Sequence, residues 1–146
     1  MKNQPLKEMS GPAMRIYVSP DAKPYKVHNA RVLPLAIQDK TKNELDSMES
    51  RGIIEQVGEE ITEWCAPMVP VMKTNGDIRI TTDFKHLNKY VERPSHPSSS
   101  PYSKLRQIKP GAKYYATMDA LQGYWQLKVD PESKKLPMFH NTIWKI

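Results

Sequence analysis

The chain has 146 residues, of which 38% are hydrophobic, and its 22 lysines and arginines against 16 aspartates and glutamates give a net charge of +6. This length allows one modest domain, and the 13 prolines predict a thinner core than in an average globular domain. The longest apolar run, residues 66–72, contains two prolines and is far shorter than the roughly 20 residues of a membrane-spanning helix, so we expect no membrane partner.

The termini and the cysteine content indicate a reducing compartment. The first residues contain no apolar signal-peptide core, and the single Cys65 cannot form an internal disulfide, so we expect a cytoplasmic or nuclear location. The histidines do not lie at zinc-ligand spacing from Cys65; they are His28, His86, His96 and His140. The positive charge suggests a polyanionic partner such as nucleic acid, although simple solubility explains a charge of this size nearly as well.

The first two segments of the chain are a lead-in and a helix. Residues 1–33 predict an extended lead-in with one short strand at 15–18. The next segment begins at Pro34, which suits a helix start, and Gly52 supplies a stop. A sparse apolar stripe between them predicts a helix over 36–51.

A β-hairpin is predicted in residues 64–88. Asn75 and Gly76 separate two apolar runs, and this dipeptide favours a tight turn because both residues tolerate positive φ. In the second strand of the hairpin, alternate residues from Ile78 share a buried face, while Arg79 and its alternate neighbours share the opposite face.

The remaining sequence predicts a linker and a second strand pair. Residues 92–103 concentrate prolines and serines and predict an irregular linker. Residues 114–119 and 125–129 alternate as strands around a turn at 121–123, so we expect them to pair. Asp130 and Pro131 then form a helix-start signature.

Asp119 lies where the first of these strands meets the turn, which suits a metal-binding carboxylate. An aspartate at a strand end is more often a turn former that bonds its own backbone, and that alternative has the better odds without further context.

Two separated motifs supply the context. The first spans Tyr115 to Gln126 and continues with Asp130, residues 134–136 and Phe139. It resembles the first catalytic motif of reverse transcriptases from gypsy-type LTR retrotransposons and retroviruses. The second lies upstream and resembles the fingers segment of the same family; it comprises residues 52–55, 63–64, 66–69, Lys73, 75–80, Asp83 and 87–89. The resemblance extends from about Pro24 to Phe139.

The resemblance implies an α+β fold, a partial fingers and palm with antiparallel hairpins and flanking helices. Residues 34–91 would be fingers-like, 92–103 a linker and 104–146 a truncated palm segment. The implied function is that of an RNA-directed DNA polymerase, with Mg²⁺ as cofactor. Its implied partners are an RNA or DNA primer-template, deoxynucleoside triphosphates and the remainder of a Pol polyprotein.

The family's motifs also imply roles for individual residues. Asp119 matches the first catalytic, metal-ligating aspartate, and Ala120 and Leu121 match positions whose peptide groups help to hold the triphosphate. Tyr124 matches the bulky residue under the incoming sugar; the alternative is an aromatic residue packed beside Trp125, a packing role that we prefer for Trp125 itself.

Further roles are implied in the fingers segment. Arg79 matches the arginine that grips the incoming triphosphate, and Lys73 the lysine that neutralises its terminal phosphate. The alternative for both is a solvated hairpin face. Asp83 and Phe84 match positions near the template, and Asn88 belongs to the fingers scaffold.

The sequence departs from the family in three places. It contains no pair of adjacent aspartates, which the family's second acidic motif requires. Residues 137–139 and the serine-rich segment 94–101 also differ from the family pattern. We therefore expect a truncated or decayed polymerase that is inactive alone. The alternatives are a basic nucleic-acid-binding module and a retroelement relic without function.

Overall fold

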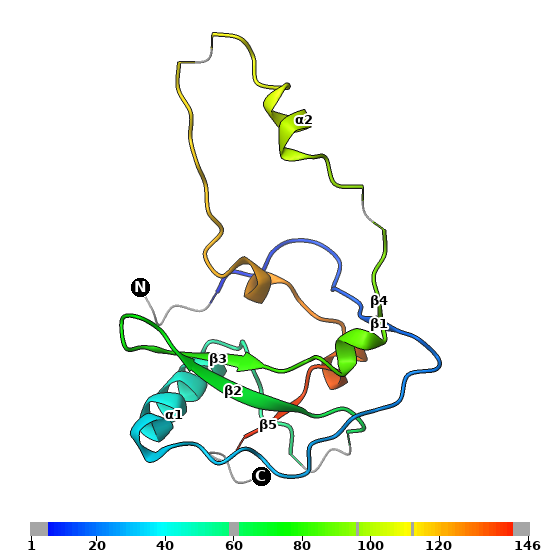
Figure 1. Ribbon diagram of the computed structural model, residues 1–146, viewed down its shortest axis with the longest axis vertical. Helices are drawn as coiled ribbons and strands as arrows, with labels where there is room; N and C mark the ends of the chain where they lie inside the picture. Colours follow the sequence, from blue (N-terminus) through cyan, green and yellow to red (C-terminus); the bar gives the residue numbers. More distant parts are fainter. Residues whose placement is uncertain (1–5, 59–61, 96, 112, 142–146) are drawn as a thin grey trace.

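The computed structural model describes residues 6–58, 62–95, 97–111 and 113–141. A body containing a three-stranded sheet and one long helix carries a long arm that projects away from it (Figure 1). Helices and strands are mixed in one chain, so the expected α+β class is confirmed. No helix of the described residues is long and apolar enough to cross a membrane.

The predicted hairpin is confirmed and forms the centre of the sheet. Strands β2 (Ala66–Met72) and β3 (Ile78–Thr82) pair antiparallel, with Met72 opposite Ile78. At the tip, Gly76 has a φ of +81°, and the Asn75 side chain accepts a hydrogen bond from the Asp77 amide at 3.1 Å. Strand β5 (Phe139–His140) adds to the other edge of β2 in parallel, giving the order β3-β2-β5.

Helix α1 (Leu35–Ser50) closes the core, and its bounds agree with the prediction to within one residue at each end. It ends where Gly52 adopts a φ of +68° and donates to the Glu49 carbonyl at 2.8 Å. Leu45 is fully buried and forms a cluster with Leu33 and Met68. Ile54, Ile80 and Phe139 pack around this cluster.

The lead-in attaches to the body at several places, including a parallel bridge between Lys26 and Cys65. Strand β1 (Tyr17–Val18), within the predicted strand, pairs antiparallel with β4 (Val91–Glu92). Further upstream, residues 9–14 run beside residues 126–130. The Met14 amide donates to the Lys128 carbonyl at 2.7 Å, and the Asp130 amide donates to the Met14 carbonyl at 3.0 Å.

The predicted pairing of strands 114–119 and 125–129 is wrong. Residues 113–120 are exposed and belong to no strand. A 3₁₀ helix, η2 (Gly123–Gln126), begins within the predicted turn and includes the first two residues of the second predicted strand. Val129 forms a parallel bridge with Met14 instead. Backbone groups of residues 126–130 therefore bond to the lead-in. The predicted helix start after Asp130 yields one 3₁₀ turn, η3 (Ser133–Lys135).

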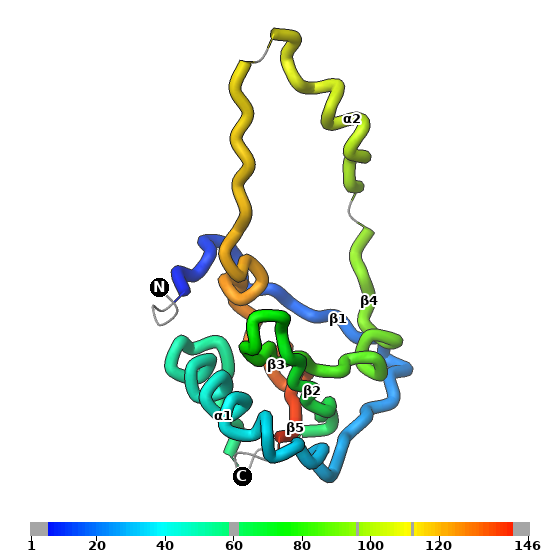
Figure 2. The backbone as a smooth tube through the Cα atoms, turned by 60° about the vertical axis from the view of Figure 1, so that its left-hand side comes forward, coloured from blue at the N-terminus to red at the C-terminus, as the bar shows by residue number. Residues whose placement is uncertain are grey.

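The arm comprises residues 93–120 and holds a helix that the sequence analysis did not expect. Helix α2 (Pro101–Leu105) begins with Ser100 as its cap, whose hydroxyl accepts from the Ser103 amide at 3.2 Å. Before the arm, a 3₁₀ helix, η1 (Leu87–Lys89), precedes β4. Figure 2 shows the arm leaving and rejoining the body as two separate lengths of chain. His96 and residues 142–146 lie outside the described residues.

Candidate functional site

Asp119 lies near the base of the arm, just before the turn that leads into η2. Its side chain is exposed, as are Ala120 and Leu121, and Tyr124 is 91% exposed. At this exposure Tyr124 buries little of its ring, which disfavours the alternative in which it packs beside Trp125. A hydrogen bond closes this turn, because the side-chain Nε2 of Gln126 donates to the Leu121 carbonyl at 2.8 Å.

Arg51, at the end of α1, connects this turn to the body. Its guanidinium carbon lies 5.8 Å from the centre of the Trp125 ring, and its Nη2 donates to the side-chain oxygen of Gln122. Gln122 has a φ of +53°, a backbone conformation that is uncommon for residues other than glycine. The contacts from α1 therefore orient the residues that follow Asp119. The sequence analysis missed this role of Arg51, because no local pattern signals a contact across 71 residues.

The two candidate phosphate-binding residues lie on the hairpin. Lys73 follows β2, where its amide donates to the Asp77 carbonyl at 2.8 Å, and Arg79 lies within β3 opposite Val71. Both side chains are exposed. A guanidinium in this position can donate two hydrogen bonds to phosphate oxygens, so the exposed hairpin face suits an anionic ligand.

The three candidate template and scaffold residues surround the end of β3. Asp83 accepts a side-chain hydrogen bond from the Lys85 amide at 3.1 Å, and its own amide donates to the Pro67 carbonyl at 3.1 Å. The Asn88 amide donates to the Phe84 carbonyl at 2.8 Å. These contacts shape the chain between β3 and η1, while the side chains of Asp83 and Asn88 remain exposed.

The structure keeps these groups of candidates separate. Among the described residues, no hydrogen bond, ion pair or ring contact joins Lys73 or Arg79 to residues 119–124. The same part of the chain contains no cluster of three or more histidine, cysteine, aspartate or glutamate side chains that could hold a metal. Mg²⁺ requires near-octahedral oxygen coordination, and two-metal catalysis needs carboxylates shared between the ions. Asp119 with its described neighbours does not fit such a site.

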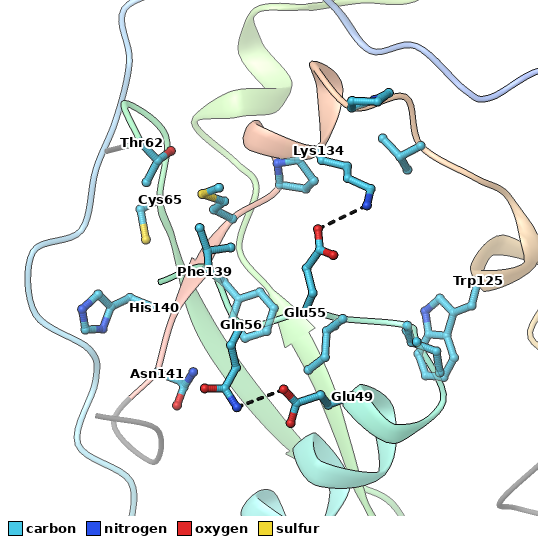
Figure 3. Close-up of a pocket in the computed structure, with 18 of the residues that line it drawn as sticks. Glu49, Glu55, Gln56, Thr62, Cys65, Trp125, Lys134, Phe139, His140 and Asn141 are labelled. Atoms are coloured by element: carbon cyan, nitrogen blue, oxygen red, sulfur yellow. Dashed lines mark hydrogen bonds and ion pairs between the residues drawn. The ribbon is translucent and has the colours of Figure 1, made fainter. Parts of the chain in front are cut away.

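An open groove of about 1900 Å³ lies in the body. Its walls come from the lead-in, the chain after α1 and residues 124–141. Figure 3 shows Phe139 facing the groove, and Lys134 extending to Glu55, where the nitrogen and oxygen are 3.2 Å apart. Gln56 donates to Glu49 at 2.9 Å beside them.

Cys65 is the thiol that lines this groove. Burial raises the pKa of its thiol, and the nearby Lys26 lowers it by a smaller amount. A thiol with a raised pKa is mostly protonated near neutral pH and is a poor nucleophile. The groove therefore suits packing or binding better than covalent chemistry.

Comparisons with known proteins relate the chain to viral polyproteins. It is 28% identical over 121 residues to an uncharacterized protein of Caenorhabditis elegans, covering 80% of this chain and 9% of that protein. It is 38% identical over 61 residues to the enzymatic polyprotein of Cestrum yellow leaf curling virus, covering 42% of this chain and 9% of the polyprotein. It is 32% identical over 78 residues to the Gag-Pol polyprotein of Koala retrovirus, covering 52% of this chain and 5% of the polyprotein.

The chain thus spans about a tenth or less of the length of the curated relatives it matches. No protein-family model matches the sequence. The similarity to several Gag-Pol polyproteins, at low identity, supports an origin of this chain in a Pol polyprotein.

Proposed function

We propose that the chain is a segment of an RNA-directed DNA polymerase. It supplies the fingers hairpin and the first catalytic aspartate, Asp119, to a nucleotidyl-transfer site. Deoxynucleoside triphosphates are its substrates, a primer-template is its partner, and Mg²⁺ is the cofactor of the assembled site. The remaining carboxylates come from the rest of the Pol polyprotein, so the chain by itself is inactive.

The observation that carries this proposal is the geometry of the hairpin. The sequence segment that resembles the family's fingers folds into β2 and β3, and both cations assigned to the triphosphate, Lys73 and Arg79, are exposed there. The similarity to Gag-Pol polyproteins, which extends over 75% of the chain in one of them, supports the origin of this segment in a Pol polyprotein.

The chain's own residues have limited roles in this function. Arg79 binds phosphate oxygens through a charge-assisted contact, and Lys73 adds a second positive charge. Arg51 is a positioning residue, because it holds the turn after Asp119 through Gln122 and Trp125. Tyr124, exposed at the start of η2, lies under the sugar of the bound nucleotide.

A complementation experiment tests the proposal. The chain alone, with Mg²⁺, primer-template and four deoxynucleotides, should extend no primer, because one carboxylate cannot hold two metal ions. A chimera that appends the downstream palm, thumb and acidic turn of a gypsy-type polymerase after Phe139 should extend the primer.

The carboxylate at position 119 provides the decisive variant. Asp119→Asn should abolish extension by the chimera, while Asp21→Asn, at an exposed carboxylate in the lead-in, should leave it unchanged. Extension by the unmodified chain, or a chimera indifferent to Asp119→Asn, would show that the assignment is wrong.

A further inference from the structure

The arm, residues 93–120, concentrates the positive charge of the molecule. Five of its side chains are cationic against the single carboxylate of Asp119, so the arm carries four of the six net positive charges. Every described residue of the arm is exposed. Its cationic side chains are Arg93, Lys104, Arg106, Lys109 and Lys113.

Exposed aromatic rings lie among these cations. Tyr102 is 67% exposed, Tyr114 is 93% exposed and Tyr115 is 74% exposed. The guanidinium carbon of Arg106 lies 5.2 Å from the centre of the Tyr102 ring, which pairs a cation with a stacking surface. These rings belong to a segment in which every described residue is exposed.

The described hydrogen bonds of the arm leave its cationic and aromatic side chains available to a ligand. Its described hydrogen bonds join residues of the arm to one another, such as the Arg106 amide to the Tyr102 carbonyl at 3.3 Å. The described ion pairs of the chain lie outside the arm. Figure 1 shows the arm standing away from the body on both of its lengths.

We propose that the arm binds single-stranded nucleic acid, with its lysines and arginines on the phosphates and its tyrosines stacked on the bases. Cations together with exposed aromatic rings are the combination that binds single strands without sequence preference. A duplex hides the faces of its bases, so the tyrosines favour single strands over duplexes. This binding needs neither metal nor nucleotide, so it goes beyond the nucleotidyl-transfer function proposed above, although the arm also contains Asp119.

Charge decides between this partner and a second copy of the chain. The arm also exposes apolar side chains, including Leu105 at 60% and Met118 at 93%, which could pack in a dimer. Two arms that each carry a net charge of +4 repel one another, whereas a polyanion is attracted. The observed charge therefore favours nucleic acid.

Fluorescence anisotropy with labelled oligo(dT) and oligo(rU), in EDTA at low salt, tests the proposal. We expect both strands to bind more tightly than a duplex of equal length. Tyr114→Ala with Tyr115→Ala should weaken binding about tenfold or more, while Tyr17→Ala, at a 53% exposed ring on β1, should not. Lys104→Ala, Lys109→Ala and Lys113→Ala together should reduce the slope of log affinity against log salt by about 2.

A triple variant with the same loss of charge outside the arm is the control for the salt slope. Lys7→Ala, Lys23→Ala and Lys85→Ala remove three exposed lysines and should change the slope by less than half as much. Equal loss in both triple variants would assign binding to the whole basic surface and overturn the proposal. Absence of binding would also overturn the proposal. A dimer detected by sedimentation, which Leu105→Ser and Met118→Ser convert to a monomer, would overturn it as well. Circular dichroism checks that every variant keeps the wild-type fold.

Discussion

Asp130 and Ser133 fasten the lead-in to the body. The Asp130 carboxylate accepts from the Ser133 hydroxyl, and from the Glu132 amide at 3.1 Å. The Ser133 hydroxyl oxygen in turn accepts from the Ile16 amide at 2.9 Å. These hydrogen bonds favour the ionised carboxylate, and the bond from Ser133 is the main cause that lowers the pKa of Asp130.

The lowered pKa predicts a pH dependence of stability. Because the folded state holds the proton less tightly than the unfolded state, the stabilisation by Asp130 is fully present above its unfolded pKa. It is lost as the pH falls through the lower folded pKa. Hydrogen exchange of the Ile16 amide, corrected for intrinsic rates, should show protection that decreases in this acidic range. Asp130→Asn should make protection insensitive to pH there, and an unchanged profile in that variant would contradict the role of Asp130.

Cys65 reports on the folded state through its raised pKa. Near neutral pH the buried thiol holds its proton and is shielded from reagents, so alkylation by iodoacetamide should be at least about tenfold slower in buffer than in denaturant. The midpoint of the rate profile should lie above the ordinary cysteine range. Mass spectrometry over time measures the rate, and equal rates with and without denaturant would show that the core around Cys65 is not formed.

At the scale of elements, α1 depends on Leu45, one of its two fully buried side chains. Leu45→Ala should lower the free energy of unfolding by about 2–5 kcal/mol, because it leaves a cavity against Leu33 and Met68. Asn43→Ala, at an exposed position in the same helix, should change it by about 0.5 kcal/mol or less. Urea denaturation followed by circular dichroism measures both, and similar midpoints would indicate that α1 does not pack on the sheet.

The elements that could be predicted from the sequence are those specified by local signals. Gly52 ends α1 and Gly76 turns the hairpin, and both act through their own backbone angles. The residues of β5 and the bridge at Met14 depend on partners far away in the sequence, which no local pattern identifies. The same reason explains the failure at residues 114–119, where alternation favours a strand but no neighbouring strand supplies hydrogen bonds.

The candidate site likewise has features that local sequence signals predict and features that they do not. Exposure of Arg79 followed from alternation in the second strand of the hairpin, and the turn after Asp119 followed from its residues. The contacts of Arg51 with Gln122 and Trp125 could not be predicted from the sequence, because they depend on how α1 meets η2.

At the scale of the whole molecule, the body and the arm are stabilised differently. The body has a buried cluster under α1, whereas every described residue of the arm is exposed. Asp119 and Ala120 lie where the two parts meet. The proposed nucleotidyl-transfer site at this junction depends on surfaces from the remainder of a polyprotein, whereas the proposed binding of a single strand by the arm does not.

The chimera described above distinguishes the role of Tyr124, close to this junction, from that of Arg79 on the hairpin. Tyr124→Val should raise incorporation of ribonucleotides relative to deoxynucleotides, because a smaller side chain under the sugar leaves room for a 2′-hydroxyl. Arg79→Ala is the comparison: it should weaken use of both nucleotides alike by about 1.5–3 kcal/mol, roughly tenfold to a hundredfold in kcat/KM, since a phosphate contact does not sense the sugar. Single-nucleotide extension kinetics measure both ratios. If Tyr124→Val lowered all incorporation and left the sugar preference unchanged, Tyr124 would lie outside the sugar-binding surface, and the nucleotide would have to bind elsewhere on the chain.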